Sequence, residues 1–253
     1  ARLNTDGSLD ATFDPGTGTG PATSEVQIFA IALQPDGRMV IGGHFTDFNG
    51  TACGHIARLN ANGSLDGTFD PGTGAAHHSV TPYVRDLVLQ PDGKVVLVGL
   101  FTSFNGMQWH VLARVNSNGS LDTGFVTTNS GPNNDVERVA LQPDGRILIV
   151  GNFTTYDAVS RLRFARINRD GTLDGDLDPG TAMNDAVYAI AVQPDGKILV
   201  GGLFTGYNGT GRNRIARING TSRVSSRVLL EGPYNGGLMN DALRTLPSFP
   251  FTD

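Results

Sequence analysis

The sequence predicts an all-β protein built from repeated four-stranded antiparallel units, and three observations support this prediction. The tetrapeptide Gln-Pro-Asp-Gly recurs, beginning at Gln34, Gln90, Gln142 and Gln193. An Ala-Arg pair recurs with the same period of about 50 residues, beginning at Ala1, Ala57, Ala113, Ala165 and Ala216. Between these markers lie short runs rich in Val, Ile and Phe, bounded by Gly, Pro, Asn and Asp, a pattern typical of strands.

Each repeat contains four predicted strands, which we call A, B, C and D in chain order. In the last repeat, strand A covers residues 187–192, strand B 197–204 and strand C 214–219, while strand D is exemplified by residues 65–69 of an earlier repeat. Pro-Asp-Gly joins strands A and B. It suits a tight hairpin because Pro presets φ at the first turn position and Gly accepts the positive φ that follows.

Four antiparallel strands in a unit of about 50 residues are typical of a β-propeller blade. The sequence contains four A–B hairpins, preceded by an N-terminal C–D half blade over residues 1–13. We expect propeller repeats over 1–220, with units near 1–56, 57–112, 113–164 and 165–215 and the start of another at 216. Residues 221–253 are expected to be a C-terminal extension or the start of a following segment. The half blade either completes the last blade or belongs to a fifth blade whose A and B strands lie elsewhere, and we favour the second arrangement.

Composition excludes several classes of function. Only 17% of residues are charged and the net charge is −5, which disfavours nucleic-acid binding. No apolar run approaches the roughly 18 residues of a membrane helix, so we expect no membrane insertion. Cys53 is the single cysteine, which excludes an internal disulfide and a multi-cysteine metal site.

The motifs also carry a family resemblance. Residues 57–66 (Ala-Arg-Leu-Asn-Ala-Asn-Gly-Ser-Leu-Asp), together with Gln-Pro-Asp-Gly-Lys/Arg and Gly-x-Phe-Thr-x-Phe/Tyr-Asn-Gly, resemble the delta-sixty repeat, a bacterial β-propeller family of undefined function. The resemblance implies a module of a larger secreted or cell-surface bacterial protein or assembly. It supplies no catalytic residues.

Two recurring sets are expected to be structural. One aromatic residue pair per repeat should lie in the core between blades, as at Phe101 and Phe104. An arginine in strand C and an aspartate in strand D also recur, and we predict that they pair as a structural ladder because a carboxylate satisfies a partly buried guanidinium. Its members are Arg58, Arg114, Arg166, Asp66, Asp122 and Asp174.

Candidate binding residues are expected on one rim. The B–C loops and D–A connections share a rim, and their sequences differ most between repeats, whereas the turns of the other rim repeat almost unchanged. Loops on a rigid scaffold often carry binding residues. The candidates on this variable rim are Trp109, His110, His77, His78 and Tyr83. In an extended chain, the adjacent His77 and His78 would point in opposite directions.

We predict no catalytic residue, no metal ion and no cofactor. The Asp/Asn-Gly turns lack the ligand spacing of a calcium-binding EF-hand loop. Cys53 and His55 lack a third group that would orient them as nucleophile and base.

The first functional hypothesis is a non-catalytic extracellular β-propeller module, a rigid structural or protein-interaction platform that acts through its variable loop rim. The alternative is a carbohydrate-binding module, so the expected partner is a protein or a surface glycan. A third hypothesis is a propeller hydrolase with a site in the central funnel, for which the loops offer Asp135, Asp157 and Asp185.

Overall fold

The computed structural model describes residues 1–20, 26–108, 111–125 and 131–220. Contacts divide the chain into two compact units, Ala1–Arg223 and Val224–Asp253. The predicted C-terminal segment, residues 221–253, lies outside the described residues. In the described ranges the chain forms strands and turns, and it has no helix long and apolar enough to span a membrane. The all-β prediction is confirmed.

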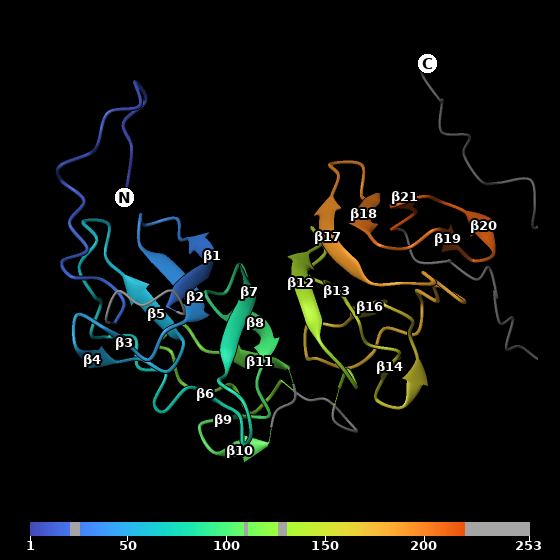
Figure 1. Ribbon diagram of the computed structural model, residues 1–253, viewed down its shortest axis with the longest axis horizontal. Coiled ribbons are helices and arrows are strands. Elements are labelled where there is room, and N and C mark those ends of the chain that lie inside the picture. Colours follow the sequence, from blue (N-terminus) through green and yellow to red (C-terminus); the bar gives the residue numbers. More distant parts are fainter. Residues whose placement is uncertain (21–25, 109–110, 126–130, 221–253) are drawn as a thin grey trace, which may run out of the picture. The chain divides into compact units, whose positions relative to one another are not determined.

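The described residues repeat one three-stranded antiparallel sheet four times (Figure 1). In each sheet the first two strands form a hairpin, and the third strand pairs with the second. The four sheets are, in order, β1 (Gln27–Leu33), β2 (Met39–His44) and β5 (Ile56–Leu59); β7 (Tyr83–Leu89), β8 (Val95–Leu100) and β11 (Leu112–Val115); β12 (Val136–Leu141), β13 (Ile147–Gly151) and β16 (Phe164–Ile167); β17 (Val187–Val192), β18 (Ile198–Gly202) and β21 (Ile215–Ile218).

The Pro-Asp-Gly segment forms the hairpin turn in every sheet. In the first sheet, the Gly37 N–H donates to the Gln34 carbonyl over 3.0 Å, and Gly37 adopts a φ of 84°. The Arg38 N–H donates to the Asp36 carboxylate over 3.0 Å, which holds the turn from the inside. Each residue of the motif therefore has the role that its chemistry predicts.

A second, smaller hairpin follows each sheet's second strand, where the sequence predicted only a loop. Its turn is Asn-Gly in three repeats; in the first, Asn49 and Gly50 have φ values of 50° and 76°. Two consecutive positive φ angles define the type I′ turn that suits two-residue hairpins. These hairpins are β3 (Asp47–Phe48) with β4 (Thr51–Ala52), β9 (Ser103–Phe104) with β10 (Met107–Gln108), β14 (Thr155–Tyr156) with β15 (Val159–Ser160), and β19 (Gly206–Tyr207) with β20 (Thr210–Gly211); β6 (Ala75–Ala76) adds to β9.

The predicted strand D is shorter than expected. It is reduced to one β-bridge beside strand C, as between Leu59 and Leu65. The chain turns immediately afterwards, because the Phe69 N–H donates to the Asp66 carbonyl over 3.1 Å. Equivalent bridges join Leu3 to Leu9, Val115 to Leu121 and Ile167 to Leu173.

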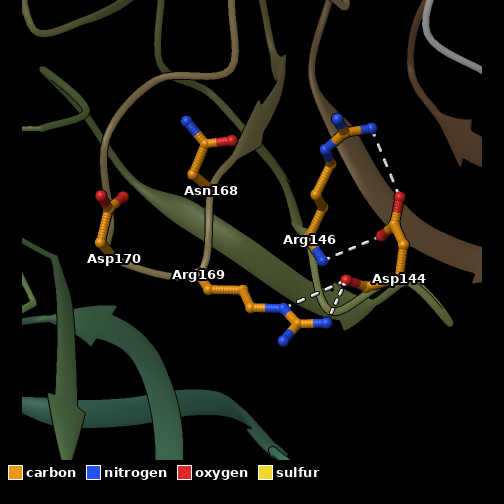
Figure 2. A pocket seen from close by; sticks show the side chains of 5 residues that line it. All are labelled: Asp144, Arg146, Asn168, Arg169 and Asp170. Atoms are coloured by element: carbon orange, nitrogen blue, oxygen red, sulfur yellow. Dashed lines mark hydrogen bonds and ion pairs between the residues drawn. The ribbon is translucent and has the colours of Figure 1, made fainter.

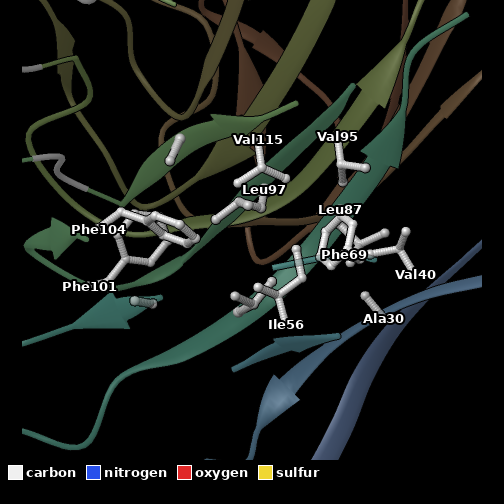
Figure 3. Packing of buried hydrophobic residues seen from close by; sticks show 13 residues of the cluster. Ala30, Val40, Ile56, Phe69, Leu87, Val95, Leu97, Phe101, Phe104 and Val115 are labelled. Atoms are coloured by element: carbon white, nitrogen blue, oxygen red, sulfur yellow. The ribbon is translucent and has the colours of Figure 1, made fainter. Parts of the chain in front are cut away.

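The core lies between the faces of successive sheets (Figure 3). Between the first two sheets, Val40 and Ile56 share one buried cluster with Leu87, Leu97 and Val115. The recurring aromatic residues are buried with them: Phe101 and Phe104 lie with their ring centroids 6.4 Å apart in an edge-to-face arrangement. The prediction that this aromatic pair is core is confirmed, and the core holds successive blades together.

Candidate functional site

The recurring arginines and aspartates form clamps that join neighbouring repeats. Arg58 Nε donates to Asp66 Oδ2 over 2.8 Å, and both side chains are buried. Arg58 Nη1 donates to the Ser117 carbonyl of the next repeat over 2.6 Å, and the guanidinium stacks on Phe69. The Nε–Oδ2 distance is 2.8 Å in Arg114–Asp122 and 2.6 Å in Arg166–Asp174.

The clamp carboxylate of Asp66 is held in the charged form. Burial alone would raise the pKa of Asp66, but hydrogen bonds from Thr68, Arg38 and Arg58 outweigh burial and keep that pKa well below its ordinary value. Because each guanidinium contacts both its own repeat and the next, these groups are structural and not available to a ligand.

One open hollow of about 340 Å³ lies at the Pro-Asp-Gly rim of the third repeat. Figure 2 shows its lining, and the side chains already have partners. Arg169 donates from Nε and Nη2 to the Asp144 carbonyl, and Arg146 pairs with Asp144. Arg146 also contacts the clamp carboxylate of Asp174 at 3.3 Å. The hollow is therefore lined by groups that hold the turns.

Part of the variable rim is structural as well. In the first repeat, Asn49 Oδ1 accepts the Gly18 N–H over 2.9 Å, and Asn49 Nδ2 donates to the Pro15 carbonyl over 3.0 Å. A Cβ at Gly16 would lie 2.8 Å from Asn49 Oδ1, so only glycine fits there. The Asp-Pro-Gly-Thr connections are thus tied to the Asn-Gly turns of the small hairpins.

The candidate ligand residues of this rim lie in different surroundings. His77 and His78 stack, with ring centroids 4.8 Å apart and planes 13° apart, which the extended chain considered in the sequence analysis would not allow. The backbone bends there because the Ser79 and Val80 N–H groups both donate to His77 Nδ1 over 3.2 Å. Trp109 and His110 lie outside the described residues.

Cys53 and His55 are both buried, and neither is placed for chemistry. Burial raises the pKa of the Cys53 thiol to about 12, which leaves it protonated. Burial and the nearby His44 lower the pKa of His55 to about 4, so its imidazole is neutral. Within the described ranges, no group of three or more His, Cys, Asp or Glu side chains could hold a metal ion.

A set of residues that the sequence analysis missed lies on the first strand of each sheet. The pairing register of all four strands shifts near the strand start, which leaves one extra residue there, a β-bulge. The second strand carries a glycine opposite each bulge; at Gly99, a Cβ would clash with the Tyr83 carbonyl oxygen. The bulged residues are Phe29, Arg85, Glu137 and Tyr188, which we call the first-strand row.

Contacts link this row across neighbouring repeats. Arg85 Cζ lies 5.3 Å from the centroid of the Phe29 ring, and Arg85 Nε donates to Glu137 Oε2 over 3.1 Å. Phe29 also meets Tyr83 edge to face, with centroids 5.5 Å apart. Tyr188, in the fourth sheet, is 40% exposed. Tyr83, a residue that the sequence analysis predicted, thus lies beside the first-strand row, whose own members were not predicted.

A partly buried carboxylate supports the same region. Asp86 Oδ1 accepts the Leu87 N–H and Asp86 Oδ2 accepts the Val139 N–H of the next repeat, each over 3.0 Å. Burial raises the pKa of Asp86, and these two hydrogen bonds offset burial only in part. Asp86 thus fixes the strand that carries Glu137 relative to the strand that carries Arg85.

A signal for the row exists in the sequence. The residue before each bulged residue is always Ile or Val, as at Ile28 and Val84. Two positions after each bulged residue stands another apolar residue, as at Leu87. The bulged position itself holds Phe, Arg, Glu or Tyr, and the position after it also varies, as between Ala30 and Asp86, while the apolar positions on either side repeat. Variable side chains next to repeated apolar positions indicate that the first-strand row is not fixed by core packing.

The chain belongs to the family described as "Domain of unknown function (DUF5122) beta-propeller". The matched residues are 1–13, 34–69, 90–125, 142–179 and 193–221, which make up more than half of the chain. The propeller fold is thereby shown, in a family of unknown function. Comparison with curated proteins gave no match.

Several solved structures are similar to this chain. The extracellular domain of a hybrid two-component system from B. thetaiotaomicron is 15% identical, with a TM-score of 0.45 over 76% of this chain and 21% of that one. A protein of unknown function from Bacteroides caccae is 14% identical, with a TM-score of 0.40 over 79% of this chain and 65% of that one. A catalytically inactive virginiamycin B lyase from Staphylococcus aureus, solved with quinupristin, is 14% identical, with a TM-score of 0.45 over 80% of this chain and 58% of that one. The chain thus spans 65% or less of the length of each.

Proposed function

We propose that this β-propeller is a non-catalytic interaction module of a secreted or cell-surface bacterial protein. The first-strand row carries this proposal: four different side chains stand at the bulged position of four sheets whose apolar strand positions repeat. Bulges re-aim side chains and are frequent beside functional sites. The secreted or surface location rests on the resemblance to the delta-sixty repeat, and so does membership of a larger chain.

Binding suits the row better than catalysis. Its only carboxylate, Glu137, is paired with Arg85, and the neighbouring Asp86 accepts two backbone N–H groups. Two of the three loop carboxylates considered for a hydrolase also accept backbone N–H groups, because Asp157 accepts the Gly131 N–H and Asp185 accepts that of Ala186. A paired or capped carboxylate is a poor general acid or base.

A carbohydrate-binding module is the second candidate function, and one observation favours it. Tyr83 and Phe29 form an aromatic pair beside the polar groups of Arg85 and Glu137. Apolar ring faces next to fixed hydrogen-bonding groups are what a sugar ring requires of its site.

The test is a binding screen of the chain against a glycan array and against candidate surface proteins. A row variant, Phe29→Ser with Tyr188→Ser, is compared with a control, Asp92→Ser with Asp195→Ser, on the Pro-Asp-Gly rim. We expect binding that the row variant loses and the control keeps. Binding that survives in the row variant would assign the function to another surface.

A further inference from the structure

We propose that the first-strand row binds an acidic sugar, with the two amino groups of Arg85 holding the carboxylate of a hexuronic-acid residue. This inference rests on the proposed function and names its ligand class. It is carried by the way Arg85 is fixed, by the unused polar atoms around it and by the aromatic wall beside it.

The guanidinium of Arg85 is held in place by only one of its donor atoms. Nε donates to Glu137 Oε2, and the planar group lies over the ring of Phe29. The Nη1 and Nη2 amino groups donate to no side chain or carbonyl in the described part of the chain, and 36% of the side chain is exposed. Two parallel amino groups on a rigid fork match the two oxygens of a carboxylate.

Arg85 differs in this respect from the clamp arginines. In Arg58, for example, Nη1 and Nη2 donate to the Ser117 carbonyl and to the Thr68 hydroxyl. Arg85 stands where the other repeats have Phe29, Glu137 and Tyr188, so the scaffold does not require an arginine at this position.

The surroundings favour a singly charged ligand. Glu137 already pairs with Arg85 through Nε, and Asp86 follows Arg85 in the chain, so carboxylates stand on both sides of this guanidinium. A dianionic phosphate would meet stronger repulsion from these carboxylates than a singly charged carboxylate ligand would.

The remaining polar atoms suit a sugar better than a peptide terminus. Glu137 Oε1 and the Tyr83 hydroxyl make no hydrogen bond with the described residues, so the ion-pair partner of Arg85 keeps a free acceptor and the aromatic neighbour of Phe29 keeps a free hydroxyl. Vicinal hydroxyls beside a carboxylate are the pattern of a uronic acid. The Phe29–Tyr83 pair offers the apolar surface against which a pyranose ring packs.

The experiment is calorimetric titration of the whole chain with trigalacturonate, compared with neutral galactotriose and with a short peptide that has a free C-terminal carboxylate. We expect trigalacturonate to bind and galactotriose to bind at least tenfold more weakly. Arg85→Gln should weaken trigalacturonate binding at least tenfold, and Arg85→Lys should weaken it less, because lysine keeps the charge and loses the fork. Arg212→Gln, which removes an exposed arginine of the fourth small hairpin, should leave binding unchanged.

Folding of the variants is checked by urea unfolding, whose midpoint should hardly change because a partly exposed ion pair contributes little to stability. Equal binding of the wild type and Arg85→Gln, or tighter binding of the peptide, would overturn the ligand class. Binding of a neutral glycan alone through the row would also overturn it, while leaving the interaction module in place. Absence of binding to every glycan and protein tested would overturn both proposals.

Discussion

Burial decides how much each Arg–Asp clamp contributes to stability, and the substitution Arg166→Met tests this directly. The Arg166 side chain is fully buried, with Nε 2.6 Å from Asp174 Oδ2 and Nη1 2.6 Å from the Gly220 carbonyl. Methionine fills much of the same volume but removes the closer of the two guanidinium groups on Asp174, which then keeps only the partly exposed Arg146 at 3.3 Å. Breaking a buried ion pair on one side costs about 3–5 kcal/mol, and because Arg146 stays in place we expect the free energy of unfolding to fall by the lower end of that range.

The N-terminal clamp provides a matched control with the same chemistry. Arg2 Nε lies 2.7 Å from Asp10 Oδ2, but 40% of the Arg2 side chain is exposed. Solvent screens such a pair, so Arg2→Met should cost below about 1 kcal/mol. Replacing both partners, Arg166→Met with Asp174→Leu, should recover part of the loss because no unpaired charge stays buried.

The assay is urea unfolding followed by far-ultraviolet circular dichroism. The slope of the free energy of unfolding against urea concentration is compared between variants, to confirm that all of them unfold in the same transition. Equal losses for Arg166→Met and Arg2→Met would refute the argument from burial. So would a double variant less stable than Arg166→Met alone.

Three further predictions concern the backbone and pH. Ala158→Gly should raise the free energy of unfolding by about 1 kcal/mol, because Ala158 has a φ of 65° where other repeats have glycine; no gain in the urea midpoint would contradict this. Gly99→Ala should destabilise by about 2 kcal/mol or more, since its Cβ meets the Tyr83 carbonyl oxygen, whereas Gly175→Ala, with open space around its Cβ, should be nearly neutral in the same unfolding assay. Burial lowers the pKa of His55 to about 4, so as the pH falls the imidazole is protonated in the unfolded chain before it is protonated in the folded chain. The free energy of unfolding should therefore fall as the pH drops from 6.5 towards 4, by at most about 3 kcal/mol. His55→Asn should flatten that pH dependence in thermal unfolding scans, and an unchanged slope would exclude His55 as its source.

Local rules made most of the scaffold predictable. Pro-Asp-Gly prescribes its own turn because Pro restricts φ and Gly permits the positive φ that the turn needs, and Gly37 has that positive φ. The recurring arginines and aspartates could be paired in advance because strands C and D are neighbours along the chain, and Arg58 does contact Asp66. The His77–His78 geometry could not be anticipated, because it depends on a bend held by His77 itself.

The sequence by itself determined the repeat, its hairpin turns and the apolar face of each strand, because these follow from residues close together in the chain. Only the tertiary structure decided which side chains of different repeats meet. The bulge that aims Arg85 at Glu137 arises where Gly99 lets two strands approach closely. Neither Arg85 nor Gly99, taken by itself in the sequence, predicts this bulge. The candidate site depends on contacts between repeats about 50 residues apart, and such contacts are fixed by packing rather than by local preference.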